Sequence, residues 1–192
     1  MPTPSPDEII SFETPVKWRQ WLADHLDQQE GIWLRMFKKN SGVASINYAQ
    51  ALDEALCYGW IDGSVQKMDE QSWLQRFTPR RARSKWSMKN TKNVQRLIAE
   101  GRIEPAGLRE VEAAKQDGRW DEAYEGPNKG KVPEDFLNEL KRHPRAWAFY
   151  QTLNKTNTYA IYYRLHTAKK PETRENRKKM IIAMLDKEQK LV

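Results

Sequence analysis

Residues 125–131 divide this sequence into two parts with different patterns. The segment reads Glu-Gly-Pro-Asn-Lys-Gly-Lys, and its Gly and Pro residues interrupt regular structure, as a linker does. Before it, apolar residues alternate between strand-like and helix-like spacing, whereas every segment after it has helical spacing. We therefore expect an α+β domain over residues 1–124, a linker over residues 125–131 and a helical C-terminal module over residues 132–192.

The first part predicts a small, mostly antiparallel sheet with flanking helices. Strand-like runs occupy residues 9–12, 32–38, 60–65 and 72–77, and the last two are joined by a polar turn. Thr14-Pro15 is typical of an N-cap followed by the first helical position, and Gly59 of a helix stop. In the helix after Thr14, the spacing predicts these core residues: Val16, Trp18, Trp21, Leu22 and Leu26.

The second part predicts helices over residues 132–141, 144–153, 158–168 and 172–187. Pro133, Pro144 and Pro171 are expected at the first helical positions. The last helix follows a strongly basic run, residues 169–179, and carries an apolar stripe behind it. This pattern suits a helix lying on its domain with Arg174, Arg177 and Lys178 facing water, and equally a helix lying on nucleic acid or an acidic membrane.

Composition excludes two classes of protein. With 39% apolar residues and eight Trp, the chain can bury a core, so disorder is excluded for most of it. No apolar run approaches the roughly 18 residues that a membrane span needs. The first eight residues have neither the basic nor the apolar region of a secretory leader, and we expect a cytoplasmic protein.

We expect no metal and no cofactor. His25, His143 and His166 lack the spacing of metal ligands, and the single Cys57 is most simply a core residue. The Gly-rich nucleotide-binding motifs, the GxSxG motif of acyl-transfer enzymes and the HExxH motif of metalloproteases are all missing.

The net charge of +7 is unevenly distributed along the chain. Residues 1–75 carry 6 Lys and Arg against 11 Asp and Glu, whereas residues 141–192 carry 13 against 4. This asymmetry allows anionic partners such as nucleic acid, an acidic membrane surface or a phosphate ligand, and it does not choose among them.

The densest basic segment covers residues 76–102, with nine positive charges and one negative. Arg80, Arg81 and Arg83 precede Trp86 and a helix that we expect to begin at Ser87. Guanidinium groups beside a helix N-terminus favour a bound phosphate or carboxylate. The alternative is a solvated loop whose arginines are structural and whose Trp86 secures the helix entry.

Asp62 is the best candidate acid in the chain, because it follows the tight corner at Gly59. It would be a general acid or base only if desolvated or paired, and the commoner role is an ion pair with Arg80, Arg81 or Arg83. If both turns fold towards one face, a cleft forms that binds an anionic ligand. Its predicted residues are Tyr58, Trp60, Asp62, Arg80, Arg81, Arg83, Trp86 and Asn90.

Several of these segments resemble the YdeI/OmpD-associated proteins, also called the bacteriocin-protection family. The resemblance rests on residues 55–63, 77–81, 84–87 and Asn90, and continues through residues 97–102, 105–108 and 114–120. It resumes at residues 132–135 and ends with residues 168–170, 172–174 and Arg177, so it covers nearly the whole chain.

The resemblance implies a small bacterial protein with an α+β N-terminal part and a helical C-terminal part. It links the chain to protection against bacteriocins or cationic antimicrobial peptides, to stress response and, through the family name, to a porin. It implies no catalytic residues. We therefore expect a non-enzymatic protection protein that binds an anionic ligand, with nucleic-acid binding as the alternative and a small-molecule enzyme using Asp62 as a third hypothesis.

Overall fold

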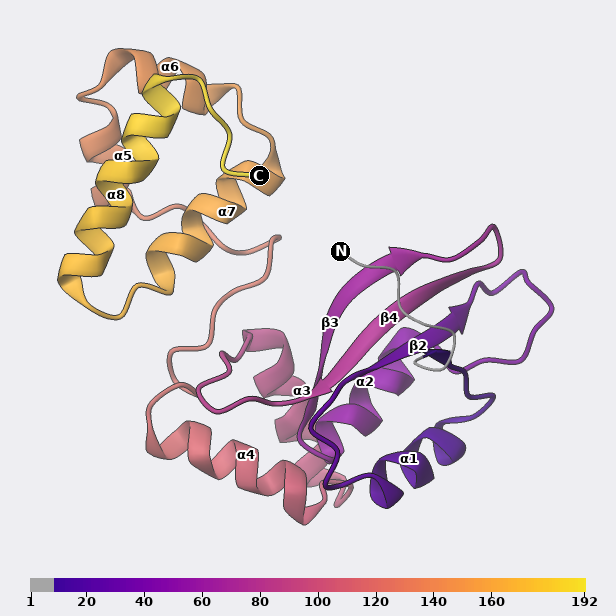
Figure 1. Cartoon of the computed structure of the whole chain (residues 1–192). Helices are drawn as coiled ribbons and strands as arrows, with labels where there is room; N and C mark the ends of the chain where they lie inside the picture. Colours follow the sequence, from indigo (N-terminus) through magenta and orange to yellow (C-terminus); the bar gives the residue numbers. More distant parts are fainter. Residues whose placement is uncertain (1–8) are drawn as a thin grey trace. The chain divides into compact units, whose positions relative to one another are not determined.

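The computed structural model describes residues 9–192, and these form two units. The N-terminal unit contains residues 9–86 and 90–122, and the C-terminal unit contains residues 87–89 and 123–192. The residues on which the expectation about a leader rests, 1–8, lie outside the described part. Figure 1 follows the chain from the sheet at its start to the four helices at its end.

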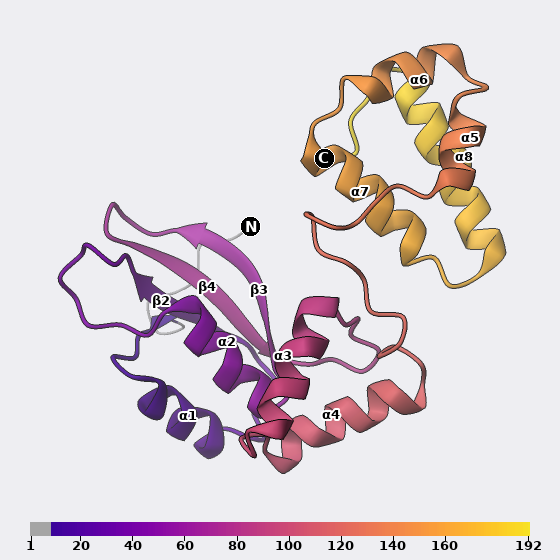
Figure 2. The same ribbon diagram turned by 180° about the vertical axis from the view of Figure 1, so that it is seen from behind.

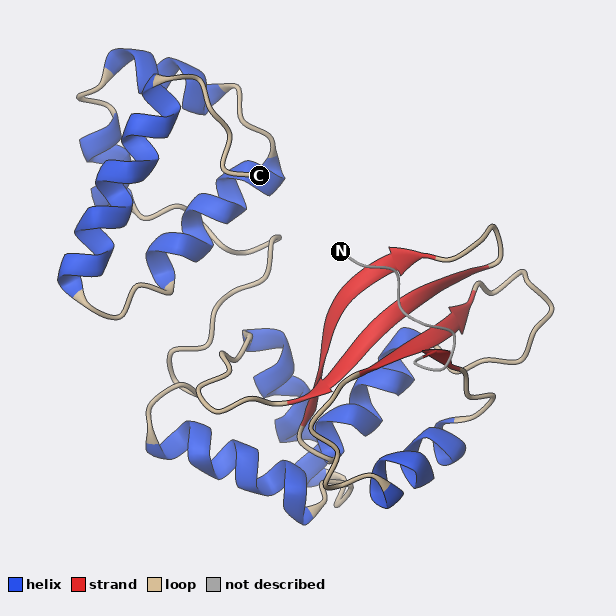
Figure 3. Cartoon of the chain, viewed as in Figure 1, coloured by secondary structure: helices blue, strands red, loops and turns tan. Residues whose placement is uncertain are grey.

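The N-terminal unit is built on a four-stranded mixed sheet (Figure 3). Its strands are β1 (Ile9–Ile10), β2 (Ile32–Phe37), β3 (Trp60–Lys67) and β4 (Ser72–Pro79), in the order β1-β2-β4-β3. Only the β1–β2 pair is parallel, because β3 and β4 form a hairpin and β4 returns antiparallel to β2. The prediction of an α+β fold with a mostly antiparallel sheet is confirmed.

Two helices, α1 (Pro15–Asp24) and α2 (Tyr48–Cys57), pack on one face of this sheet (Figures 1 and 2). Trp18 of α1 is fully buried, and its ring lies 5.8 Å from Phe77 of β4 and 6.4 Å from Trp60 of β3. Two further helices, α3 (Met88–Ala99) and α4 (Pro105–Gln116), complete the unit's secondary structure.

The predicted helix ends are largely correct. The Thr14 hydroxyl accepts the N–H of Lys17, and Pro15 begins α1. Gly59 has a φ of +77°, a left-handed conformation that suits glycine, and it ends α2. The predicted core stripe of α1 is wrong at its two ends, since Val16 and Leu26 are 74% and 54% exposed. Val16 is the second residue of α1, and Leu26 follows the helix, which ends at Asp24.

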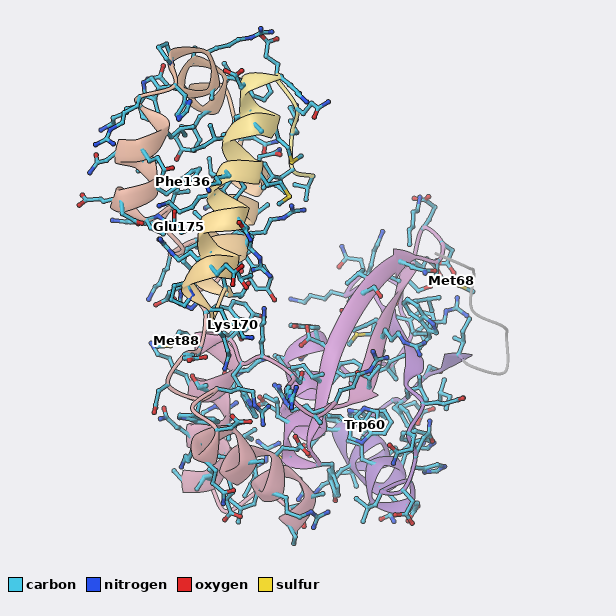
Figure 4. All side chains as sticks on the ribbon, turned by 60° about the vertical axis from the view of Figure 1, so that its left-hand side comes forward. Trp60, Met68, Met88, Phe136, Lys170 and Glu175 are labelled. Atoms are coloured by element: carbon cyan, nitrogen blue, oxygen red, sulfur yellow. The ribbon has the colours of Figure 1, made fainter. Side chains whose placement is uncertain are left out.

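Four helices make the C-terminal unit: α5 (Glu134–Leu140), α6 (Pro144–Gln151), α7 (Lys155–His166) and α8 (Pro171–Asp186). They enclose a core that includes Phe136, Leu165 and Ile181, and Figure 4 labels Phe136 among the side chains of this unit. Pro144 and Pro171 begin their helices as predicted, whereas Pro133 is the N-cap of α5 rather than its first residue.

The segment predicted to be a linker, residues 125–131, makes hydrogen bonds to α7. The Tyr162 hydroxyl accepts the N–H of Glu125 at 2.9 Å, and the Tyr159 hydroxyl donates to the Glu125 carbonyl at 3.2 Å. A Cβ added to Gly130 would lie 2.5 Å from the Tyr162 ring. The start of this segment is therefore held to the helical unit, while the predicted domain boundaries stay a prediction.

Candidate functional site

Asp62 lies on β3, on the sheet face that α1 and α2 cover. Its carboxylate accepts a hydrogen bond of 2.8 Å from the hydroxyl of Tyr48, the first residue of α2. Burial, together with this bond, holds the pKa of Tyr48 above its ordinary range. The predicted ion pair with Arg80, Arg81 or Arg83 is wrong, because the register sets Asp62 opposite Phe77, whose side chain packs under α1.

Two other predicted site residues also belong to the interior side of this unit. Trp60 is 2% exposed, and its ring lies 5.8 Å from that of Trp21, edge to face. Tyr58 is half-buried, with the Arg19 guanidinium 5.3 Å from its ring centre. Trp60 therefore packs in the core and offers no ring face to a ligand.

Arg80 and Trp86 are brought together, but both are buried. The guanidinium carbon of Arg80 lies 3.5 Å from the centre of the Trp86 ring, and Arg80 Nη1 donates to the Lys85 carbonyl at 3.3 Å. Arg80 is 7% exposed, Trp86 2% and Asn90 8%. The prediction that these three side chains present a ligand-binding surface stays untested, but their contacts fit the structural alternative, in which Arg80 holds the loop.

A second buried arginine, Arg119, also holds this loop. Its Nε donates to the carboxylate of Asp117 and its Nη1 donates to the Ser84 carbonyl at 2.8 Å. The Trp86 ring also packs 5.0 Å from the ring of Trp120, the next residue along the chain. Sequence reasoning missed Arg119, although residues 117–120 are part of the family resemblance.

The helix that follows Trp86 does not offer its first amide to an anion. It begins at Met88, and the Met88 N–H donates to the carbonyl of Tyr124 at 2.8 Å. The expected anion at this N-terminus would compete with that carbonyl for the same donor.

Arg81 instead lines a separate pocket at one end of the sheet, with a volume of about 310 Å³. Arg76 and Thr78 come from β4, and residues 29–31 precede β2. Arg76 and Thr78 share the face opposite the helices, because side chains alternate along β4 and Phe77 between them is buried. The residues that line this pocket, called here the arginine pocket, are Gln29, Glu30, Gly31, Arg76, Thr78, Pro79 and Arg81.

Backbone packing fixes the floor of the arginine pocket. The register pairs Ile32 with Phe77, which sets Gly31 beside Thr78. A Cβ on Gly31 would lie 2.3 Å from Cγ2 of Thr78 and 2.5 Å from the Phe77 carbonyl oxygen, so only glycine fits there. The loop that carries Glu30 is thereby held closely against β4.

The two arginines of this pocket make no ion pair with any described residue. The Arg76 guanidinium lies 5.5 Å from the ring centre of Trp33, its cross-strand partner on β2. Arg81 is exposed. Arg76 belongs to the predicted basic segment but not to the predicted site. The alternation of side chains along β4 could have shown that Arg76 and Phe77 point to opposite faces of the sheet.

Arg83, a predicted site residue on the same loop as Arg81, lies outside the arginine pocket. It is exposed, and its φ of +65° is the left-handed conformation, unusual for a residue with a side chain. It does not line the pocket.

The basic helix α8 makes internal pairs that the sequence did not predict. Arg174 binds the carboxylate of Asp135 on α5 through both terminal nitrogens, and Arg177 donates to the Arg164 carbonyl on α7. Lys178 is 7% exposed and pairs with Glu139 and Glu175. The expectation that Arg174, Arg177 and Lys178 all face water is wrong, because carboxylates of α5 bind Arg174 and Lys178 and a backbone carbonyl of α7 binds Arg177.

The C-terminal unit has a pocket of about 420 Å³ along α8. Its wall mixes both charges over an apolar floor, and the lining residues are Glu139, His143, Lys179, Ile182, Ala183 and Asp186. It shares no residue with the predicted site.

Burial determines the protonation state of the Cys57 side chain. Its side chain is fully buried, and burial, followed by the charge of Glu54, raises the pKa of the thiol to about 11. A thiol with this pKa is a poor nucleophile at neutral pH. In residues 9–192, no cluster of three or more His, Cys, Asp or Glu has a geometry suited to a metal ion. None of the helices in that range combines the length and the apolar character needed to cross a bilayer.

Comparison with protein families gives two matches. Residues 10–110 match the family described as "Domain of unknown function (DUF8412)". This range includes strands β2 to β4 and all residues that line the arginine pocket. Residues 129–188 match the family described as "Bacteriocin-protection, YdeI or OmpD-Associated", which confirms the resemblance for the C-terminal part of the chain. Residues 55–63, which also suggested that family, fall within the first match. No curated protein and no solved structure matches the chain.

Proposed function

We propose that this chain, which belongs to the DUF8412 family through residues 10–110 and matches the bacteriocin-protection, YdeI or OmpD-associated family over residues 129–188, is a protection protein that binds an anionic ligand in its arginine pocket. Bacteriocin protection is suggested by the description of the C-terminal match. Anion binding is argued from the N-terminal unit alone.

The observation that carries the proposal is the pair Arg76 and Arg81. Both line one pocket of about 310 Å³, and neither makes an ion pair with a described residue. Several other arginines of the same unit are neutralised, since Arg19 and Arg102 share Glu54 and Arg96 binds Asp53. A guanidinium group presents a planar fork that binds phosphate or carboxylate through two hydrogen bonds, so two such groups favour an anion.

The proposal is binding rather than catalysis. The acid considered for chemistry, Asp62, lies opposite Phe77 on the helix-covered face, whereas Arg76 and Thr78 lie on the other face of the sheet. Asp62 is also engaged by the Tyr48 hydroxyl. It is therefore not placed to act on a ligand held by Arg76 and Arg81.

Thermal unfolding of the full chain in increasing inorganic phosphate tests the site. Wild type is expected to be stabilised in a saturable manner, because a ligand that binds only the folded state raises its stability. Arg76→Ala and Arg81→Ala are each expected to weaken phosphate affinity about tenfold, the loss of a charge-assisted bidentate contact. Arg83→Ala is the matched control, an exposed arginine of the same loop outside the pocket, and it should respond as wild type. Equal responses in all four proteins would rule out the arginine pocket.

Protection is tested in cells. A sensitive bacterial strain that expresses the wild-type chain should survive a bacteriocin or a cationic peptide better than the strain that expresses the Arg76→Ala/Arg81→Ala protein. Fractionation of the same cells tests the cytoplasmic location, which remains part of this proposal along with any porin partner. Equal survival of the two strains would show that protection does not depend on Arg76 and Arg81.

A second candidate is nucleic-acid binding by the C-terminal unit. This unit has 16 Lys and Arg against 8 Asp and Glu, a net charge of +8, which is more than the whole chain carries. Its exposed basic residues on and after α5 are Lys141, Arg142, Arg145, Lys155, Lys169, Lys170, Lys179, Lys187 and Lys190. Phosphate contacts from such residues make affinity fall steeply as salt rises.

A gel-shift titration at two salt concentrations tests this second candidate. The variant Lys141→Ala/Arg142→Ala/Arg145→Ala removes three neighbouring charges at the start of α6 and should weaken binding and reduce its salt dependence. Absence of binding at low salt would exclude the candidate and leave the arginine pocket unaffected.

A further inference from the structure

The arginine pocket also contains a carboxylate. Glu30 lines it together with Arg76 and Arg81, and Glu30 is exposed. The Glu30 carboxylate makes no ion pair within 4.0 Å to either arginine or to any other described residue. One pocket thus holds two positive groups and one negative group that do not neutralise one another.

Backbone packing places Glu30 beside the strand that leads to the two arginines. Gly31 packs directly on Thr78 and the Phe77 carbonyl, so the residue before it is anchored at the end of β4. Arg81 lies shortly after the end of the same strand, and Arg76 comes from within it. The three charged residues therefore come from two chain segments whose backbones pack against each other at one end of the sheet.

A ligand with one kind of charge fits this arrangement poorly. A plain phosphate that reaches Arg76 and Arg81 enters a pocket that Glu30 also lines, and like charges in one pocket repel. A molecule with an anionic group at one end and an ammonium group at the other satisfies all three residues. The pocket volume of about 310 Å³ leaves room for a small molecule of this kind.

We propose that the ligand of the arginine pocket is a small zwitterion, whose anionic group binds Arg76 and Arg81 and whose ammonium group binds Glu30. This inference rests on the proposed function and specifies its ligand class. The same chemistry occurs in free aminoalkyl phosphates and in the ethanolamine headgroup of a phospholipid.

Two probes of nearly equal shape isolate the ammonium group. O-phosphoethanolamine and n-propyl phosphate differ at one end, where an ammonium group replaces a methyl group. Titration calorimetry of wild type is expected to show tighter binding of O-phosphoethanolamine, by about threefold to fivefold, the strength of one exposed ion pair.

Glu30→Gln gives opposite expectations for the two probes. It should weaken O-phosphoethanolamine binding, because the partner of the ammonium group is lost. It should strengthen n-propyl phosphate binding, because a repulsive charge is lost. Glu112→Gln, an exposed glutamate of α4 outside the pocket, is the matched control and should change neither affinity.

The outcomes separate the inference from the function on which it rests. Equal binding of the two probes to wild type, or an equal gain for both in Glu30→Gln, would overturn the zwitterion while leaving an anion site in place. If neither probe nor inorganic phosphate binds wild type, the proposed function itself fails.

A vesicle arm distinguishes the two sources of such a ligand. Sedimentation with vesicles that contain phosphatidylethanolamine, reduced in Glu30→Gln and in Arg81→Ala, would identify a lipid headgroup. Binding of soluble O-phosphoethanolamine without vesicle binding would identify a free metabolite.

Discussion

Arg80 and Arg83 are separated by two residues, yet they have opposite environments. Arg80 is 7% exposed with its guanidinium on the Trp86 ring, whereas Arg83 is exposed. Arg80→Ala should lower the free energy of unfolding by about 2–3 kcal/mol, since it removes a desolvated cation–π contact and a hydrogen bond to the Lys85 carbonyl. Arg83→Ala should change it by less than about 0.5 kcal/mol.

Urea unfolding followed by tryptophan fluorescence measures this difference, with the change in midpoint compared between the two variants. Similar midpoints for Arg80→Ala and wild type would mean that Arg80 does not hold the loop.

At the scale of single residues, the sequence indicated which segment is rich in arginine but not which arginine side chains are buried. The density of arginines around residue 81 drew attention to a segment that includes Arg76 and Arg81. It did not reveal that Arg80 turns inward, because this depends on Trp86 and on Arg119 and Trp120 from after α4. Contacts over more than 30 residues leave no periodic signal in a sequence.

At the scale of elements, local sequence signals predicted helix ends and the hairpin, but the sequence did not predict which distant strands pair. Thr14-Pro15 and Gly59 predicted helix ends because caps act within one turn. The turn between β3 and β4 likewise predicted their hairpin. The place of β4 between β2 and β3, which sets Arg76 above Trp33, arises from long-range strand pairing. That pairing determines the arginine pocket, so the pocket could not be predicted.

The contact between α2 and α4 depends on Gly107. A Cβ there would lie 2.3 Å from the Cys57 carbonyl oxygen and 2.8 Å from that of Leu56, so the backbones of the two helices are close. Gly→Ala inside a helix ordinarily stabilises by up to about 1 kcal/mol, but here overpacking should destabilise by about 1–3 kcal/mol.

Gly126→Ala is the control for this substitution, because a Cβ on Gly126 meets nothing within 4 Å. The free energies of unfolding of both variants give the answer. A Gly107→Ala protein more stable than wild type would show that the two helices can move apart at little cost.

The contact between α5 and α8 should weaken as the pH falls. The two hydrogen bonds from Arg174 lower the pKa of Asp135 to about 2, from an ordinary value of 3.8. A carboxyl group with a depressed pKa stabilises the fold above its ordinary pKa, and this stabilisation is lost as the pH falls from about 4 to about 2. Because Asp135 is half exposed, solvent screening limits the effect to about 0.5–1 kcal/mol.

Asp135→Asn should therefore lower stability at neutral pH and lose less of it below pH 4 than wild type does. Helical circular dichroism across that pH range, in wild type and variant, measures the difference. Parallel acid unfolding curves would show that the Asp135–Arg174 pair contributes nothing.

At the scale of the whole molecule, charge is divided between the two units. The N-terminal unit has 17 Lys and Arg against 18 Asp and Glu, whereas the C-terminal unit has a net charge of +8. The sequence predicted this asymmetry correctly because charge needs no structure to be counted. The count alone would assign an anionic ligand to the C-terminal unit. The arginine pocket lies instead in the nearly neutral unit, where Arg76 and Arg81 line one pocket without an ion pair to a described residue.

The central claim is that Arg76 and Arg81 together bind an anion. Two-dimensional NMR of the arginine Nε–Hε groups in the full chain, during a titration with inorganic phosphate, tests it most directly. The account predicts that the signals of Arg76 and Arg81 shift and saturate with one dissociation constant, while the signal of Arg83 stays in place. If the three signals shift alike and without saturation, phosphate only screens the surface charge, and the arginine pocket is not a binding site.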